Sequence, residues 1–219
     1  MTGTPQETSF SERIQGMLKA GKLPIASTSE GLPEESPERP EKPHVAGLRK
    51  AGIGERFWDC SFDNYRTETE VSKVALETCK SYVEECKFEQ GLGIFLVGIA
   101  DKGKTHLFAS MLRETKATKK YLTIEDYFVS LRSTFGAAGK TEKDYIESLT
   151  SVSLLILDDL GKLKGADSYE QRMLWYLLDK RYQAKLGTAM STNLGIKELK
   201  DCFEARTLRR LEAEIVRVG

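Results

Sequence analysis

The stretch that most restricts the fold of this chain is GIFLV followed by GIADKGKTH, residues 93–106. Its first five residues are an apolar run of strand length, and residues 98–105 have the spacing Gly-x-x-x-x-Gly-Lys-Thr. A helical pattern starts at Lys104. A tight turn between a buried strand and a helix can cradle phosphate oxygens, because the first amides of the helix point at the anion. The stretch therefore predicts a phosphate-binding loop; the alternative is an ordinary strand–turn–helix unit that contains a lysine.

Strands and helices alternate after this loop, which predicts an α/β fold with a mainly parallel sheet and helices on both faces. A capping-box pattern at Thr67–Glu70 predicts a further helix before the loop. Its expected buried face consists of Val71, Val74, Ala75, Cys79, Tyr82, Val83 and Cys86. The expected strands lie at 93–97, 121–124, 154–157, 188–192 and 215–218, and the expected helices at 104–117, 125–135, 141–149, 168–184 and 196–213.

The N-terminal part of the chain has a different character. All six prolines lie between Pro5 and Pro43, and residues 22–46 are poor in large apolar side chains, which predicts a disordered linker. In the tail before it, residues 1–21, four apolar residues at helical spacing predict a short amphipathic helix: Phe10, Ile14, Met17 and Leu18. That helix is either a frayed tail or a segment that orders in a partner's groove. The globular core is expected at 47–219.

Composition excludes several classes of protein. Thirty-three basic and 33 acidic residues leave no net charge, which argues against a polycationic nucleic-acid binder. The longest apolar run is too short to cross a membrane, and no secretory signal is visible. Four cysteines without a CxxC pair, and two histidines, argue against a zinc site and favour reduced thiols in the cytoplasm.

Two adjacent carboxylates, Asp158 and Asp159, follow the apolar strand pattern 154–157. Carboxylates buried at a strand end are costly unless a cation or a reacting water is present. Asp158 is suited to hold Mg²⁺ with the Thr105 hydroxyl, and Asp159 is suited to orient or deprotonate a water that attacks a γ-phosphate. Lys104 would reach the outer phosphates as a point charge. The alternative for the pair is a solvated turn.

A polar residue, Asn193, also follows the strand pattern 188–192. The last expected helix contains several arginines. Asn193 could bond the attacking water or the γ-phosphate, although an isolated asparagine there is more often a turn residue. Arg206 and Arg210 are four residues apart and share one helix face. They form either a solvated basic face or an arginine finger that acts on a neighbouring subunit's phosphate.

With these elements in this order, the chain resembles the AAA+ ATPases, and among them the DnaC/DnaI helicase loaders and the IstB transposition ATPases. The similarity covers about residues 47–219 and rests on GIGERFWDCSFDNY, GKTHL, LLILDDLG, STN and ARTLRRL. The resemblance implies a parallel-sheet P-loop NTPase and, because the sequence stops at Gly219, an AAA+ core without the lid subdomain. It implies ATP bound by Gly98, Asp101, Lys102, Gly103, Lys104, Thr105 and His106, Mg²⁺ at Thr105 and Asp158, and catalytic roles for Asp159, Asn193, Arg206 and Arg210.

The loop departs from the family pattern at one point. The family sequence GxxGxGKT has glycine where this chain has Asp101, followed by Lys102. Aspartate tolerates left-handed backbone, so we expect the loop to keep its shape. The carboxylate would nevertheless oppose the phosphates, which predicts weak nucleotide affinity or slow hydrolysis.

The resemblance implies an ATPase that loads a replicative helicase during DNA replication. The helix of the tail would bind the hexameric helicase, and subunits would associate through their ATP sites. Single-stranded DNA is the second expected ligand; its candidate contacts, which could instead pack on the sheet, are Tyr127, Phe128, Arg132, Lys140 and Lys143. One rival function is an IstB-like helper of a transposase on duplex DNA. The other, which Asp101 favours, is a nucleotide-independent adaptor.

Overall fold

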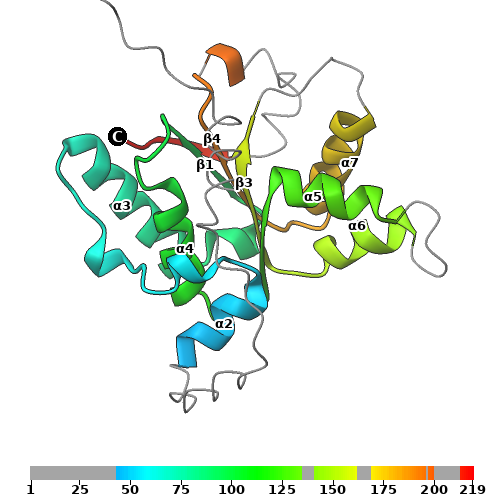
Figure 1. Cartoon of the computed structure of the whole chain (residues 1–219), viewed down its shortest axis with the longest axis horizontal. Helices are drawn as coiled ribbons and strands as arrows, with labels where there is room; N and C mark the ends of the chain where they lie inside the picture. Colours follow the sequence, from blue (N-terminus) through cyan, green and yellow to red (C-terminus); the bar gives the residue numbers. More distant parts are fainter. Residues whose placement is uncertain (1–42, 135–140, 162–168, 196, 200–212) are drawn as a thin grey trace, which may run out of the picture. The chain divides into compact units, whose positions relative to one another are not determined.

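The computed structural model contains one five-stranded sheet (Figure 1). The structure describes residues 43–134, 141–161, 169–195, 197–199 and 213–219. The strands are β1 (Gly93–Val97), β2 (Lys119–Thr123), β3 (Leu154–Leu160), β4 (Thr188–Thr192) and β5 (Ala213–Arg217). Their spatial order is β2-β3-β4-β1-β5, and every neighbouring pair is parallel. The predicted α/β class and parallel sheet are therefore confirmed.

Helices cover both faces of the sheet, because successive strand residues point to opposite sides. On β1, Ile94 and Leu96 face one hydrophobic core, and Phe95 and Val97 face the other. Figure 1 shows the two helical layers. The first contains α2 (Pro43–Ala51), α3 (Glu70–Glu84) and α4 (Lys104–Glu114), and the second contains α5 (Ile124–Arg132), α6 (Glu142–Thr150) and α7 (Tyr169–Gln183). Short 3-10 turns lie at η1 (Glu55–Phe57), η2 (Phe62–Asn64) and η3 (Lys87–Gln90).

Helix α3 begins later than its sequence pattern predicts. Thr69, not Thr67, is the N-cap, and its side chain exchanges hydrogen bonds with Ser72 in a capping box. The predicted burial of Ala75, Cys79, Tyr82 and Val83 is confirmed, and Ser72 and Leu76 are buried beside them. The predicted burial of Val71 and Val74 is wrong, since both are exposed. Cys86 is also exposed, because it lies beyond the helix end with a left-handed φ of 50°.

The described part of the chain starts with a helix that the sequence pattern did not indicate. Helix α2 begins at Pro43, inside the stretch 22–46 predicted as a linker. Leu48 and Ala51 are fully packed, and Gly52 ends the helix with a φ of 99° that glycine adopts without strain. The predicted tail helix at Phe10–Leu18 lies outside the described residues. No helix within the described ranges is long and apolar enough to span a membrane.

A fully buried arginine ties the second helical layer to the sheet. Arg181 on α7 has no solvent exposure, and burial lowers the pKa of its guanidinium to about 10, so it is still a cation at neutral pH. Its Nη1 donates to Leu149 O (2.7 Å) and Val152 O (2.9 Å), at the end of α6. The remaining bonds reach the entries to β3 and β4: Nε to Thr188 Oγ1 (3.0 Å), and Nη2 to Ser153 O (3.1 Å) and Gly187 O (2.6 Å).

We expect Arg181→Met to lower the free energy of unfolding by about 2–4 kcal/mol, because buried carbonyls lose their donors. Arg172→Met is the matched control, since Arg172 is exposed on the same helix and its loss should cost less than about 0.5 kcal/mol. Urea unfolding followed by circular dichroism measures both. Equal midpoints for the two variants would contradict the structural role of Arg181.

Candidate nucleotide-binding site

The loop between β1 and α4 packs closely against Val218 and Tyr65. Asp101 and Gly103 are both left-handed, with φ of 61° and 86°, as the sequence led us to expect for Asp101. Gly98 has no room for a side chain, because a Cβ there would lie 2.1 Å from Val218 O. A Cβ on Gly103 would lie 2.7 Å from the ring of Tyr65. The loop therefore turns into α4 through positions that only small or left-handed residues fill.

Lys104 is only 6% exposed, and its ammonium group lies inside the loop. Its Nζ donates to Gly98 O (2.7 Å), Ile99 O (2.8 Å) and Asn193 Oδ1 (2.6 Å). Burial lowers the Lys104 pKa, and the nearby carboxylates Asp159, Asp158 and Asp101 act in the opposite direction. Lys104 thus connects the loop after β1 with the residue that follows β4.

Asp158 is a buried carboxylate, 3% exposed, at the carboxyl end of β3. Three hydroxyls from different elements donate to it: Thr105 Oγ1 and Tyr121 OH at 2.7 Å, and Ser191 Oγ. Burial and the Asp158 charge raise the pKa of Tyr121, so its hydroxyl stays a donor. A hydroxyl and a carboxylate placed together are hard oxygen ligands of the kind that Mg²⁺ takes beside phosphate oxygens and water.

The Asp159 side chain, unlike that of the buried Asp158, faces solvent. The register between β3 and β4 shifts between Leu157 and Leu160, and Asp159 has a left-handed φ of 65°. Its side chain is exposed, and Oδ1 accepts a bond of 2.9 Å from Asn193 Nδ2. Asn193 therefore bridges Lys104 and Asp159, and the local irregularity lets two successive carboxylates serve the same edge of the sheet.

Lys104, Asp159 and Asn193 line a hollow of about 410 Å³ at the carboxyl ends of the strands. Arg56 and Phe57 from η1 also line it. The sequence pattern assigned no role to them, although they lie in the lead-in GIGERFWDCSFDNY. The full lining is Arg56, Phe57, Ala100, Asp101, Gly103, Lys104, Thr105, His106, Asp159 and Asn193.

His106 and Lys102 take part in holding the loop from outside. His106 Nε2 lies 2.9 Å from Ser61 O, and its ring packs edge-on against Tyr65 at 5.3 Å between centroids. Tyr65 OH donates to Lys102 O (3.3 Å). The segment before α3 thus supports the loop through the Ser61 carbonyl and the Tyr65 side chain.

The remaining candidates either fall outside the described residues or lie away from this hollow. Arg206, Arg210 and Lys140 lie outside the described residues. Tyr127 is fully buried and donates to Met173 O (3.0 Å), so its proposed stacking on DNA is wrong. Phe128 is half-buried against the same core, because α5 packs on the sheet. Arg132 pairs with Glu170 (3.2 Å), and Lys143 with Glu147 (3.6 Å).

The donor set of the hollow fits a magnesium nucleotide. The first amides of α4 have no carbonyl of their own helix to bond, and the Lys104 ammonium adds positive charge beside them. Thr105 lines the hollow and its hydroxyl donates to Asp158, so these two residues would supply the oxygen ligands. Within the described ranges, no cluster of three or more histidine, cysteine, aspartate or glutamate side chains could hold a metal by itself. A cation here would therefore need phosphate oxygens or water to complete its ligands.

A family model and individual relatives both match this sequence. Residues 42–211 match the family model of the IstB-like ATP binding proteins. The replicative helicase loader DnaC of Escherichia coli strain K12 is 30% identical over 168 residues, which are 75% of this chain and 67% of DnaC. DnaC of Buchnera aphidicola subsp. Acyrthosiphon pisum is also 30% identical, over 75% of this chain and 68% of the relative.

Solved structures agree on the fold. The crystal structure of the DnaC helicase loader has a TM-score of 0.66 at 22% identity and covers 76% of this chain and 100% of that one. The crystal structure of DnaI has a TM-score of 0.61 at 18% identity, with coverage of 77% and 92%. The replication initiator DnaA bound to AMPPCP and single-stranded DNA has a TM-score of 0.64 at 18% identity, with coverage of 77% and 51%. The chain therefore belongs to the IstB-like ATP-binding family, among the AAA+ P-loop proteins that include the DnaC and DnaI helicase loaders.

Proposed function

We propose that the protein is an ATPase that loads a replicative helicase. The observation that carries the ATPase part is a set of hydrogen bonds at one edge of the sheet. Asn193 bonds both Lys104 and Asp159, and Thr105 donates to Asp158. The 30% identity to the DnaC loaders supports the loading part. ATP and Mg²⁺ are the proposed cofactors.

The geometry supports a division of labour among the residues. The loop from Gly98 to Gly103 and the amides of α4, including those of Thr105 and His106, bind the phosphates. Thr105 and Asp158 hold Mg²⁺, which when bound neutralises phosphate charge. Asp159 orients the attacking water, and Asn193 fixes the Asp159 carboxylate through its present 2.9 Å bond.

Lys104 links nucleotide binding to the Asp159 carboxylate through Asn193. In the structure its ammonium bonds two loop carbonyls and Asn193. A bound γ-phosphate would compete for these three N–H donors, and Asn193 Oδ1 would be the acceptor that it replaces. The bond from Asn193 Nδ2 would still hold the Asp159 carboxylate that orients the water. We propose this exchange as the step by which ATP activates the site.

The partners follow from the same proposal. The tail 1–21 binds the hexameric helicase through its helix, the stretch before α2 tethers it, and the core that starts with α2 carries the ATPase. Arg210, with Arg206 beside it, acts on the ATP of a neighbouring subunit. Single-stranded DNA is the second ligand, and the role places the protein in the cytoplasm.

The function is tested by helicase capture and loading. Full-length protein should retain the purified hexameric helicase of its host, and a variant with serine at Phe10, Ile14, Met17 and Leu18 should lose it. Lys104→Ala should keep capture yet fail to transfer the helicase to single-stranded DNA. The IstB-like family match makes a transposase helper the second candidate; retention of a transposase in place of the helicase would establish it. Undiminished loading by Lys104→Ala would identify a nucleotide-independent adaptor.

We expect Asp101→Asn to raise ATP affinity about 3- to 10-fold, because it removes a carboxylate charge at the rim of the hollow. Asparagine keeps the side-chain size and tolerates the left-handed φ of 61°. Titration with a fluorescent ATP analogue measures the affinity, and the gain should shrink at high salt. Asp101→Gly is the matched variant without a side chain; wild-type affinity in both would show that the Asp101 charge does not limit binding.

We expect Asp159→Asn to leave ATP binding intact and to lower hydrolysis on the order of a hundredfold or more, since the water loses its orienting base. Phosphate release and analogue binding are measured on the same samples. Asp179→Asn on α7, away from the hollow, is the control and should hydrolyse ATP like the wild type. A parallel loss of binding in Asp159→Asn would contradict the assigned role.

A further inference from the structure

An arginine from the segment before α3 lines the hollow of about 410 Å³ beside the phosphate loop, which we call the nucleotide hollow. It is Arg56, the middle residue of the short 3-10 turn η1. Arg56 is exposed, whereas Lys104 in the same hollow is buried and its ammonium group already bonds two loop carbonyls and Asn193. The hollow therefore has one cation fixed inside the loop and a second one that is open to solvent.

The backbone that carries Arg56 is held in place by the residues around it. Phe57 N donates to Gly54 O (3.0 Å), which closes the turn. The Trp58 indole Nε1 donates to Ile53 O (3.1 Å). Both aromatic rings are half-buried against the core of the first helical layer, and η1 packs on α4. The fold itself therefore sets the place from which the Arg56 side chain starts.

The Arg56 side chain lies on an aromatic ring and keeps its donors available. Its Cζ is 5.1 Å from the ring centroid of Phe57, so the guanidinium group is within cation–π distance. A guanidinium group on a ring face still has N–H donors around its edge for another acceptor. Among the described residues, no carboxylate lies within ion-pair distance of Arg56 and no acceptor takes a hydrogen bond from it. These donors are therefore available to a ligand in the hollow.

The charges that line the nucleotide hollow favour a role for this second cation. The lining includes two exposed carboxylates, Asp101 and Asp159, and the ammonium group of Lys104. Without Arg56 these side chains would leave the lining negative, and a nucleoside triphosphate would bring further negative charge. The opposition is strongest at Asp101, where the family pattern has glycine. Arg56 balances the lining without occupying the loop itself.

Arg56 also lies on the side of the loop where hydrolysis is proposed. Thr105, Asp159 and Asn193 line the same hollow, and they are the residues proposed to hold Mg²⁺ and to orient the attacking water. A second hollow of about 400 Å³ also borders the loop and is lined by side chains from residues 64–72. Neither Arg56 nor Asp159 lines that second hollow. The position of Arg56 therefore suits the outermost phosphate of a bound nucleotide.

We propose that Arg56 binds the terminal phosphate of ATP within its own subunit and makes the site prefer ATP to ADP. Its guanidinium group donates from η1, while the Lys104 ammonium group donates from inside the loop. The inference rests on the proposed ATPase function, because it needs a nucleotide in the hollow. It gives a single subunit a means to tell ATP from ADP, whereas Arg206 and Arg210 are proposed to act on the phosphate of a neighbouring subunit.

The other use of Arg56 would be as a counter-charge for Asp101 alone, since both side chains line the hollow. A counter-charge acts on ADP and ATP alike, because it lowers the negative potential of the whole hollow. A direct contact to the terminal phosphate strengthens the binding of ATP and leaves that of ADP unchanged. The two uses therefore differ in the ratio of the ATP and ADP affinities.

The test is the nucleotide affinity of the full-length protein with Mg²⁺, measured by calorimetric titration with ADP and with the ATP analogue AMPPCP. Arg56→Ala should weaken AMPPCP binding about 10-fold, as for a charge-assisted contact at a partly exposed site, and should change ADP binding by less than about 2-fold. Arg56→Lys keeps the charge but loses the planar fork, so its AMPPCP affinity should fall only about 3-fold.

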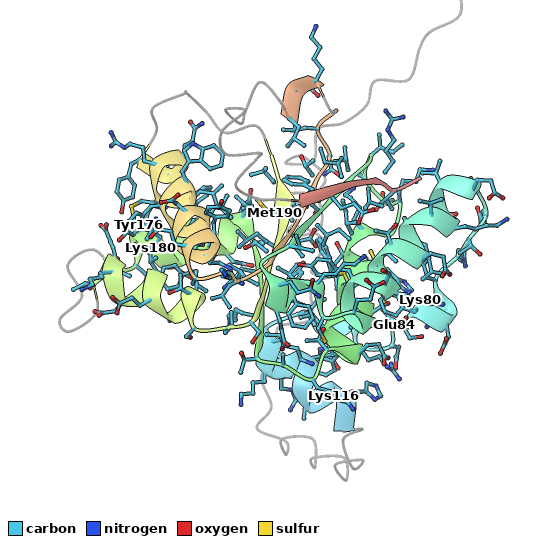
Figure 2. All side chains as sticks on the ribbon, turned by 180° about the vertical axis from the view of Figure 1, so that it is seen from behind. Lys80, Glu84, Lys116, Tyr176, Lys180 and Met190 are labelled. Carbon is cyan, nitrogen blue, oxygen red and sulfur yellow. The ribbon has the colours of Figure 1, made fainter. Side chains whose placement is uncertain are left out.

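Lys180→Ala is the matched control. Lys180 is an exposed cation over an aromatic ring, with Nζ 5.4 Å from the ring centroid of Tyr176, and neither residue lines the nucleotide hollow. Figure 2 shows the two side chains next to each other on α7. This variant should bind both nucleotides like the wild type. Urea unfolding should show nearly the same midpoint for Arg56→Ala and the wild type, because an exposed side chain contributes little to stability.

Two results for Arg56→Ala would overturn this inference alone. Equal losses of AMPPCP and ADP affinity would make Arg56 a counter-charge of the hollow, and wild-type affinity for both would show that Arg56 does not contact the phosphates. In either case Lys104→Ala, which should lose most of its AMPPCP affinity, still tests the ATPase function by itself. A wild-type protein that binds neither nucleotide would overturn the ATPase function and this inference together.

Discussion

The arrangement of the site depends on one buried charge, the carboxylate of Asp158. An ionised carboxylate away from water costs several kcal/mol unless donors surround it. Its donors come from α4, β2 and β4, through Thr105, Tyr121 and Ser191. Hydrogen bonds to a charged group contribute about 1.5–3 kcal/mol each, so these three elements are held in register around β3. The buried charge therefore explains why the phosphate loop is fixed against the middle of the sheet.

Backbone strain is concentrated where the chemistry is proposed. Asp101 and Asp159 both have left-handed φ, and the other non-glycine residues with positive φ in the described ranges are Cys86 and Lys185, which follow helix ends. A left-handed residue costs about 1–2 kcal/mol, less for aspartate because its side chain can bond locally. At Asp159 the left-handed backbone places an exposed carboxylate next to the buried carboxylate of Asp158. A regular strand would send the second side chain to the opposite face.

The sequence predicted the parts of the site that are local. Each of these parts follows a strand pattern: the loop to Thr105 comes after residues 93–97, and the Asp158–Asp159 pair and Asn193 come after two other strand patterns. Parallel strands bring such ends to one edge of the sheet. Their roles in hydrolysis stay predictions. Tyr121, Ser191 and Phe57 were missed because their part in the site arises from contacts across the sheet or from a short 3-10 turn. Tyr127 shows the converse: its aromatic ring suggested stacking on DNA, but the apolar face of α5 buries it.

Helix α7 lies between the two strands that lead to the candidate site. It lies in the sequence between β3, which carries Asp159, and β4, which leads to Asn193. Its inner face is anchored by Arg181, whose guanidinium bonds the entries to both strands. The Asp159–Asn193 contact lies at the opposite ends of the same two strands. The position of these two side chains therefore depends on a buried cation that belongs to the helix between the strands.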